Sequence, residues 1–299
     1  MIRVESNGKI LGATVTGVDL SKPLSKPDFA AVLRALGERG VLRFPDQLIN
    51  AHQLLDFSLR FGKVQVLTAS KHTEPGLPEV TILSNIVENG KPIGSADAGQ
   101  FWHTDMSYNA VIGYVNILVA HAVPVRDGQI RGATEFVNTE AAYADLSEQW
   151  KERLADAVAM HDLNKSWEWL RTVRNSPRAP LTPAERAAHP PVPHPVFLTH
   201  PVTGKKVIYV NPNTAVNIVG MPEAESNATL DMLYAHILQP QYRYVHQWRQ
   251  GDLLIWDHIR TWHQAVADYG PHEPRLMKRC QVMADRIFDP AFVAEALAA

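Results

Sequence analysis

The chain has 299 residues, of which 45% are hydrophobic and 20% charged, and its formal net charge is −2 at pH 7. This composition is typical of a globular protein with a substantial core, and the small charge gives no support for binding to nucleic acid or to a membrane surface. The single cysteine, Cys280, excludes an intrachain disulfide and a cysteine-based zinc site. The first residues lack the apolar run of a signal peptide, and no segment approaches the ~20 apolar residues that span a bilayer, so we expect a cytoplasmic enzyme.

The N-terminal part of the chain predicts two helices with a short strand between them. Apolar residues recur at helical spacing over residues 28–39, where Ser25 is a candidate N-cap and Gly40 a candidate stop. Around this helix, the pattern predicts a strand and turn at 11–20, a strand at 41–44 and a second helix at 50–61.

The rest of the chain predicts mainly strands, interrupted by helices at 139–159 and 223–237. A loop rich in glycine and proline is expected at 88–100. Residues 176–195 hold many of the 21 prolines and predict a surface excursion within a single domain that spans 1–299. Predicted strands, rich in β-branched residues and bounded by turn residues, lie at 80–85, 114–120, 206–210, 253–256 and 278–282.

A histidine and a carboxylate two positions apart, His103 and Asp105, form the first candidate metal motif. Residues at i and i+2 of a strand point to the same face, so both side chains could reach one cation. A remote histidine, His263, would complete the set of two histidines and one carboxylate that leaves positions open on non-heme Fe(II). Imidazole also suits copper, nickel and zinc, and the tripeptide alone is weak evidence, because such a pattern arises by chance in many proteins.

The surroundings of these residues strengthen the metal hypothesis. The aromatic side chains of Trp102 and Tyr108 flank the first motif and could wall a pocket. Downstream, Arg275 and Arg279 lie four positions apart at the start of a predicted strand. Arginine binds carboxylates in a bidentate manner, which suits the distal carboxylate of a dicarboxylic 2-oxo acid. If His103 and His263 share one metal, strands from both halves must meet, which favours one domain built on a sheet sandwich.

Several motifs spread over nearly the whole chain resemble the taurine dioxygenase and 2,4-dichlorophenoxyacetate dioxygenase family, whose members depend on Fe(II) and 2-oxoglutarate. The opening resembles the family at 11–20, in Phe-Pro-Asp-Gln at 44–47 and in Arg-Phe-Gly at 60–62. The later matching segments are Trp-His-Thr-Asp at 102–105, Gly-Ala-Thr-Glu-Phe at 132–136, Thr-His-Pro-Val-Thr-Gly-Lys at 199–205, the block at 256–263 and the block at 275–279.

The resemblance implies a mainly β fold, a double-stranded β-helix or jelly roll with flanking α-helices. It implies that His103, Asp105 and His263 bind Fe(II), with 2-oxoglutarate and O2 as co-substrates. It further implies that Thr134 and Arg275 hold the C5 carboxylate of 2-oxoglutarate. Arg279 would then face the acidic group of the primary substrate.

Three positions add detail to the resemblance. The family usually has asparagine after the Trp-Asp pair, whereas this chain has His258, which could support the loop to His263 or mark different surroundings of the metal. Residues 66–70 lack the histidine and tyrosine that contact sulfonate in taurine-specific relatives, which argues against taurine. Asn85, on a strand that leads towards the metal loop, is a candidate contact for substrate or co-substrate.

The implied reaction is oxidation of a small anionic organic substrate, with release of succinate and CO2. Asp105 favours oxygenation, because halogenases of related fold have a small residue at that position. Hydroxylation, with cleavage where the carbon bears a heteroatom, is the expected outcome. Desaturation or ring formation in a biosynthetic pathway would use the same ligands.

Two further alternatives are a zinc hydrolase and a catalytically inactive binding protein on the same scaffold. The zinc reading does not explain Thr134 or the two arginines, and the intact ligand set argues against an inactive protein. We expect a small-molecule substrate and a homo-oligomer, because symmetric assemblies are common among such enzymes.

Overall fold

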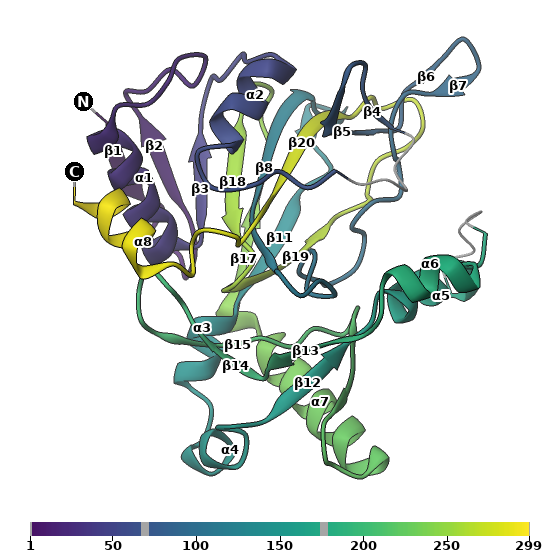
Figure 1. Ribbon diagram of the computed structural model, residues 1–299. Coiled ribbons are helices and arrows are strands. Elements are labelled where there is room, and N and C mark those ends of the chain that lie inside the picture. Colours follow the sequence, from purple (N-terminus) through teal and green to yellow (C-terminus); the bar gives the residue numbers. More distant parts are fainter. Residues whose placement is uncertain (1, 67–71, 174–178, 299) are drawn as a thin grey trace.

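A large, mostly antiparallel sheet forms the centre of the computed structural model, which describes residues 2–66, 72–173 and 179–298 (Figure 1). The pairing is antiparallel throughout except between β2 and β3. In spatial order the eight strands are β1 (Arg3–Ser6), β2 (Ala13–Thr16), β3 (Val41–Phe44), β18 (Leu253–Asp257), β8 (Gly113–Ala122), β20 (Leu276–Met283), β5 (Leu77–Ser84) and β4 (Thr73–Glu74). The position of β8 between β18 and β20 brings the middle of the chain against its C-terminal part.

A smaller sheet packs against the inner face of the large sheet. It has the order β17 (Arg243–His246), β11 (Thr134–Asn138) and β19 (Thr261–Ala265), and both pairings are antiparallel. Buried side chains from both sheets, including Phe136 and Trp256, fill the space between them, and the centroids of these two rings lie 5.5 Å apart. The molecule is therefore rich in sheet, as predicted, and the core between the sheets is apolar.

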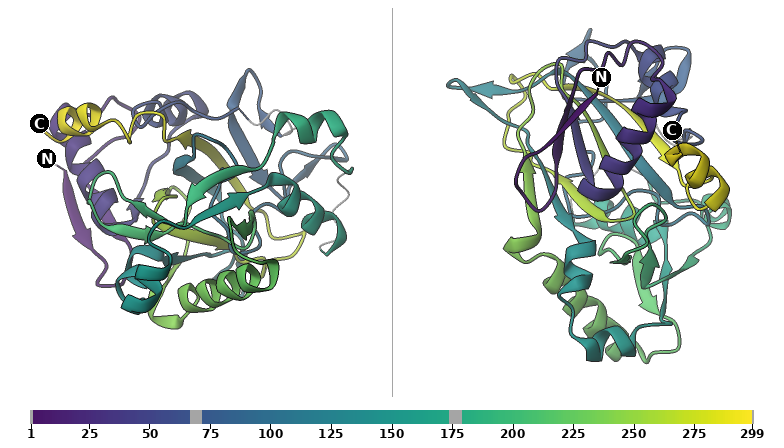
Figure 2. Two further views of the ribbon diagram at one scale, coloured as in Figure 1. Left: turned by 60° about the horizontal axis from the view of Figure 1, so that its bottom comes forward. Right: turned by 90° about the vertical axis from the view of Figure 1, so that its left-hand side faces the viewer.

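Helices cover the outer face of the large sheet. These are α1 (Lys26–Arg39), α2 (Ala51–Ser58) and the C-terminal α8 (Pro290–Leu297), and α1 and α8 lie side by side (Figure 2). The predicted caps of α1 are confirmed, since Ser25 accepts a hydrogen bond from the backbone of Asp28 and Gly40 has a φ of 69°. Cys280 points into this outer core and is fully buried, which confirms it as a core residue.

A second region lies below the sheets in the view of Figure 1 and contains most of the middle of the chain. The prediction of one helix over 139–159 is wrong in its extent. Two short helices occupy the first part of the range, and Val158 and Ala159 instead begin a strand that pairs on both sides. Strand pairing with distant segments outweighs the local helical pattern here. The elements of this region are α3 (Thr139–Ala144), α4 (Glu148–Arg153), β12 (Val158–His161), β13 (Val192–Pro195), β14 (Phe197–Thr199), β15 (Lys206–Ile208), β16 (Ala215–Ile218), α7 (Glu223–Ile237) and a 3-10 turn at Pro240–Tyr242.

The predicted proline-rich excursion is shorter than expected in the part that the structure describes. Residues 179–191 lie mostly exposed and include the helix α6 (Pro183–Ala188), whereas β13 joins a sheet with β12 and β16. The excursion therefore ends before Val192. It follows α5 (Leu163–Thr172), which lies next to α6 at the edge of the molecule (Figure 1).

Two short hairpins complete the strands. They are β6 (Val87–Glu88) with β7 (Lys91–Pro92), inside the predicted loop at 88–100, and β9 (Val125–Arg126) with β10 (Gln129–Ile130). Within the described residues, none of the helices is both long enough and apolar enough to cross a membrane.

Candidate metal centre

His103 and His263 are brought together by their backbones. His263 lies on β19, and each of the two residues donates its backbone N–H to the carbonyl of the other, at 3.1 and 2.8 Å. This bridge places the two imidazole centroids 4.2 Å apart. The geometry places His103 in a single β-bridge, rather than at the end of a regular strand, and a tight turn follows in which Met106 has a φ of 59°.

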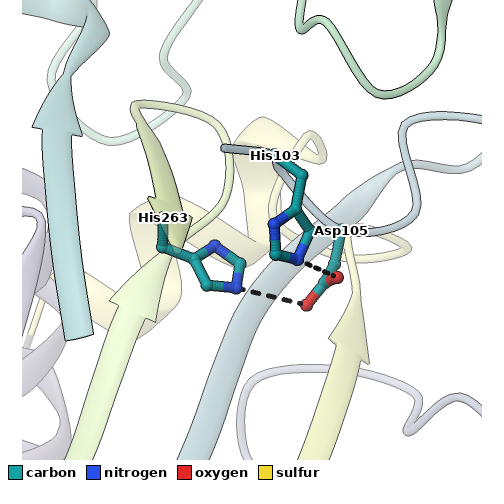
Figure 3. Close-up of side chains that lie close together, drawn as sticks. All are labelled: His103, Asp105 and His263. Atoms are coloured by element: carbon teal, nitrogen blue, oxygen red, sulfur yellow. Dashed lines mark ion pairs between the residues drawn. The ribbon is translucent and has the colours of Figure 1, made fainter. Parts of the chain in front are cut away.

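The turn directs Asp105 towards both rings (Figure 3). One carboxylate oxygen, Oδ1, lies 3.3 Å from Nε2 of His103, and the other, Oδ2, lies 3.8 Å from Nε2 of His263. The potential ligand atoms of these three residues lie within 4.8 Å of one another, and no other such group was found among the described residues. The three predicted metal residues, distant in sequence, therefore converge on one point.

The electrostatics of the three side chains suit a bound cation. Burial, together with the neighbouring His103, lowers the pKa of His263 well below its usual value, so this ring is neutral and can act as a ligand. Burial alone would raise the pKa of Asp105. The hydrogen bond and charge of His103, with the charges of the other histidines, hold it well below its usual value instead. His103 is oriented by a 2.7 Å contact between its Nδ1 and the carbonyl of Phe101, which leaves Nε2 facing Asp105.

Two residues that the sequence reasoning had not linked to the carboxylate surround its outer oxygen. Asn116, fully buried on β8, donates its side-chain N–H to Oδ2 of Asp105 at 3.0 Å. Nε2 of His258 lies 3.7 Å from the same oxygen. A polar residue inside an otherwise apolar strand is the signal in the sequence that could have pointed to Asn116.

Nε2 of His258 is therefore turned towards Asp105, while its Nδ1 lies 3.4 Å from the hydroxyl of Thr104. The loop to His263 is held by further bonds: Thr104 donates its hydroxyl to the backbone carbonyl of His258 at 2.8 Å, and Asp257 accepts from the backbone of Ile259 at 2.7 Å. Burial lowers the pKa of His258 to about 4, although Asp105 opposes the shift, so the ring is neutral.

The second group of predicted residues comprises Thr134 and Arg275. Thr134, on β11, accepts a hydrogen bond from the indole of Trp248 at 2.9 Å and is buried. Arg275 is also buried, and no carboxylate among the described residues pairs with it. Gly132 lies close by, and a Cβ there would come within 3.3 Å of Nε of Arg275, so glycine keeps room beside the guanidinium.

Asn85 forms hydrogen bonds that stabilise the segment carrying Arg275. Its amide donates to the carbonyls of Gly270 and Glu273, at 3.1 and 3.0 Å, and its carbonyl oxygen accepts from the backbone N–H of Arg275 at 2.8 Å. These contacts are with backbone rather than with a ligand. The predicted contact of Asn85 with substrate therefore stays a prediction, and the geometry adds a positioning role.

Arg279 faces the metal site from β20. Its NH1 atom lies 3.8 Å from Oδ2 of Asp105, and no described residue hydrogen-bonds to its buried Nε atom. Tyr108, on the other side, is close to both charges. Burial and the charge of Asp105 raise its pKa to about 12, and Arg279 opposes the shift. One partly buried cation, Arg279, therefore lies beside the point where the three metal residues converge.

These features fit a metal ion and an acidic co-substrate. The imidazoles of His103 and His263 and the carboxylate of Asp105 form a ligand set that iron accepts, and the guanidinium of Arg275 lacks the anion that buried arginines normally pair with. The prediction for 66–70, which argues against taurine, lies outside the described residues except at Val66.

Comparison with known proteins agrees with this geometry. The family model described as "Taurine catabolism dioxygenase TauD, TfdA family" matches residues 5–281. Pentalenolactone F synthase of Streptomyces arenae is 31% identical over 292 residues, which cover 95% of each chain. The 2,4-dichlorophenoxyacetate dioxygenase of Burkholderia sp. (strain RASC), which depends on alpha-ketoglutarate, is 30% identical and covers 84% of each chain.

Solved structures are similar over the same length. The crystal structure of AAD-2 with Mn(II) and N-oxalylglycine has a TM-score of 0.77 at 28% identity, covering 95% of this chain and 97% of that one. A 2,4-D dioxygenase homologue from Burkholderia xenovorans has a TM-score of 0.78 at 28% identity, with 96% and 98% covered. The chain thus belongs to the TauD/TfdA family and is a non-heme iron dioxygenase that uses Fe(II), 2-oxoglutarate and O2.

Proposed function

We propose that this enzyme hydroxylates a small anionic organic substrate on a single domain, residues 1–299, built on a double-stranded β-helix. The observation that carries the proposal is the convergence of His103, Asp105 and His263 on one point, with Arg279 3.8 Å from Asp105. The buried Arg275 adds a guanidinium whose Nε atom has no hydrogen-bond partner among the described residues. The two facing sheets, with an apolar core between them, support the jelly-roll architecture.

The three converging residues are proposed to hold Fe(II). Bound there, the iron supplies oxidation of a C–H bond by O2, coupled to decarboxylation of 2-oxoglutarate to succinate and CO2. The protein's part would be to present two imidazoles and one carboxylate to the iron. Asn116 fixes the outer oxygen of Asp105, and the backbone bridge fixes the separation of His103 and His263.

The C5 carboxylate of 2-oxoglutarate is proposed to bind Arg275 and Thr134. A buried guanidinium costs free energy unless an anion neutralises it, so the site favours an acidic ligand. Asn85 holds the backbone of Arg275 in place, and the bond from Trp248 leaves the hydroxyl proton of Thr134 free to be donated to a carboxylate. Arg275 and Thr134, with Asn85 and Trp248 behind them, would favour a dicarboxylic acid over a monocarboxylic one.

Arg279 is proposed to bind the anionic group of the primary substrate. Its present neighbour is Asp105, whose charge a bound metal would largely neutralise, so the guanidinium would then be available to a substrate anion. Asp105 also supports oxygenation rather than halogenation, since it fills the position that a halide would need. A second outcome, ring formation or desaturation, is favoured by one observation, the similarity to a pentalenolactone F synthase.

A panel of small organic acids, scored by substrate-dependent succinate formation, tests the function. We expect at least one acid to raise succinate release well above a His103→Ala control. A zinc hydrolase would give no visible charge-transfer band when Fe(II) and 2-oxoglutarate are added without oxygen, and a colourless mixture would reject the iron assignment. Succinate release that never exceeds the control would favour an inactive binding protein.

The substrate role of Arg279 has its own test. Arg279→Ala should raise the KM for the acid found in the panel much more than the KM for 2-oxoglutarate. Lys278→Ala is the matched control, because Lys278 is the preceding residue of the same strand and pairs with Glu74 at 2.8 Å instead. Equal effects of Arg279→Ala on both KM values would reject the assignment. We also predict a homo-oligomer, which light scattering on the purified enzyme would check.

A further inference from the structure

A cavity of about 270 Å³ lies beside the metal motif, between the residues that precede His103 and helix α5. Its walls include Phe101, Trp102, Trp169 and Leu238, and its polar lining residues are Lys165 and Asn213. The volume is close to the lower end of the ~300–1,000 Å³ typical of pockets for small molecules. The cavity can therefore take a group of the size of one or two rings.

One aromatic side chain in the wall of the cavity, Phe101, also contacts the candidate metal centre. The ring centroid of Phe101 lies 5.0 Å from that of His103 and 5.0 Å from that of Trp169. The carbonyl of Phe101 also contacts Nδ1 of His103 at 2.7 Å. A molecule in the cavity would therefore lie one ring away from a proposed metal ligand.

The lining indicates the chemistry of the occupant. Three aromatic rings favour an apolar, ring-shaped group, because flat rings stack against one another or meet edge to face. The ammonium of Lys165 donates one hydrogen bond, to the carbonyl of Ala215 at 2.6 Å, and an ammonium has three N–H donors. No carboxylate occurs among the described residues that line the cavity, so nothing in its walls competes for the remaining donors.

Building on the proposed function, we propose that this cavity binds the apolar body of the primary substrate, an organic anion with a cyclic body, and that Lys165 donates a hydrogen bond to an oxygen atom carried on that ring. The anionic end binds Arg279, and the ring packs against the cavity wall that Phe101, Trp102 and Trp169 form. The enzyme would then act on bulky, oxygenated acids and discriminate against short ones.

Binding to the loaded enzyme tests the ring part of this proposal. The protein is saturated with Mn(II) and N-oxalylglycine, which keep it from turning over, and calorimetry gives the Kd of acetate and of cyclohexylacetate. We expect cyclohexylacetate to bind at least tenfold more tightly, about 1.4 kcal/mol. Trp169→Ala should remove most of this difference, whereas Trp167→Ala, on the same helix but outside the cavity lining, should keep it.

A filling variant guards against loss of structure in Trp169→Ala. Asn213→Phe should weaken cyclohexylacetate at least fivefold and leave acetate within twofold, since it takes up cavity volume without removing a wall. Equal affinity of the two acids for the wild-type enzyme, or equal effects of Trp169→Ala and Trp167→Ala, would overturn the proposal.

The role of Lys165 is tested with 4-oxocyclohexylacetate, which adds one acceptor oxygen to the same ring. The wild type should prefer it over cyclohexylacetate by at least threefold, and Lys165→Met should abolish the preference, with Lys151→Met as the control. An unchanged preference in Lys165→Met would reject the role of this lysine. Failure of the wild type to bind Mn(II) or N-oxalylglycine would instead reject the proposed function, so the two failures are distinct.

Discussion

Two groups of buried histidines in this molecule look alike in the sequence and differ in what surrounds them. The metal-site histidines are His103, His258 and His263, and the lower histidines are His161 and His194, whose ring centroids lie 5.3 Å apart. Both groups are buried, and in both an imidazole nitrogen lacks a hydrogen bond from the described residues, as for Nε2 of His161 and Nε2 of His258.

The difference between the groups is the carboxylate. Asp105 lies within 3.8 Å of all three metal-site histidines, whereas the lower histidines bond to the hydroxyl of Thr214 and to the carbonyl of Asn109. Burial lowers the pKa of His161 to about 3, with the charges of His194 and Lys165 adding to the shift, and no carboxylate opposes it. Burial is therefore shared by the two groups, and the convergent negative charge of Asp105 distinguishes the one that suits a cation.

Removing the negative charge of Asp105 should have the largest effect, because this charge distinguishes the two groups of histidines. Asp105→Asn keeps the shape of the side chain and makes the metal-site histidines resemble the lower ones. We expect the affinity for Mn(II) to fall more than 100-fold and turnover to be lost, because a neutral amide is a poor ligand for a hard cation. Calorimetry with Mn(II) measures the effect. Thr214→Val, in the lower group, is the control, and a similar loss there would contradict the comparison.

Removing the buried cation next to the site should have the second largest effect. Arg275→Ala should raise the KM for 2-oxoglutarate about 100-fold, close to the ~3 kcal/mol of a hydrogen bond between charged groups. The affinity for Mn(II) should change little, because Arg275 is not among the converging ligand residues. Steady-state kinetics with varied 2-oxoglutarate checks this. Arg153→Ala, whose side chain pairs with Glu225 in the lower region, should leave this KM unchanged.

The burial of the lower histidines predicts that the free energy of unfolding depends on pH. Because the folded-state pKa of His161 is about 3 and the unfolded value is about 6.5, the unfolded chain binds the proton first as the pH falls. The free energy of unfolding is then lost as the pH drops below 6.5. Between pH 7 and 5 the wild type should lose about 2 kcal/mol more than His161→Gln. Urea unfolding of both proteins at the two pH values measures the difference, and parallel curves would show that His161 does not titrate in this way.

The smallest expected effect sharpens the role of the residue that orients Asp105. Asn116→Ala removes the donor to Oδ2 and should weaken Mn(II) binding about tenfold, as is typical when a hydrogen bond to a ligand is lost. Asn116→Ser, which can still donate, should recover part of the loss. An effect of the same size on thermal stability in both variants, with unchanged Mn(II) affinity, would give Asn116 a purely structural role.

The identity of the metal residues could be predicted from the sequence, whereas their surroundings could not. His103, Asp105 and His263 are recognisable because few residue types bind iron, and the glycines and capping residues around α1 act locally. Asn116 approaches Asp105 only because β8 lies between β18 and β20, an order set by pairing between distant segments.

The same non-local pairing explains the other differences. Residues 139–159 have a helical pattern, yet Val158 and Ala159 are drawn into a strand by partners at Pro195 and His194. Asn85 could be placed near the site from its strand, but its three bonds to the backbone of 270–275 depend on how two loops meet. Local patterns thus fix where elements begin and end, and tertiary pairing decides which polar groups meet.

Because of the backbone bridge between His103 and His263, the metal residues and most of the cavity lining can change independently. The spacing of the two imidazoles depends on main-chain hydrogen bonds, which substitutions of neighbouring side chains leave in place. The cavity is lined by Phe101 and Trp102, next to His103, and by residues of α5, of the loop at 212–213 and just beyond the end of α7, three segments that supply none of the converging residues. Substitutions in those three segments can therefore change substrate preference while the metal residues stay the same. This scaffold is accordingly a good starting point for redesigning selectivity without rebuilding the metal centre.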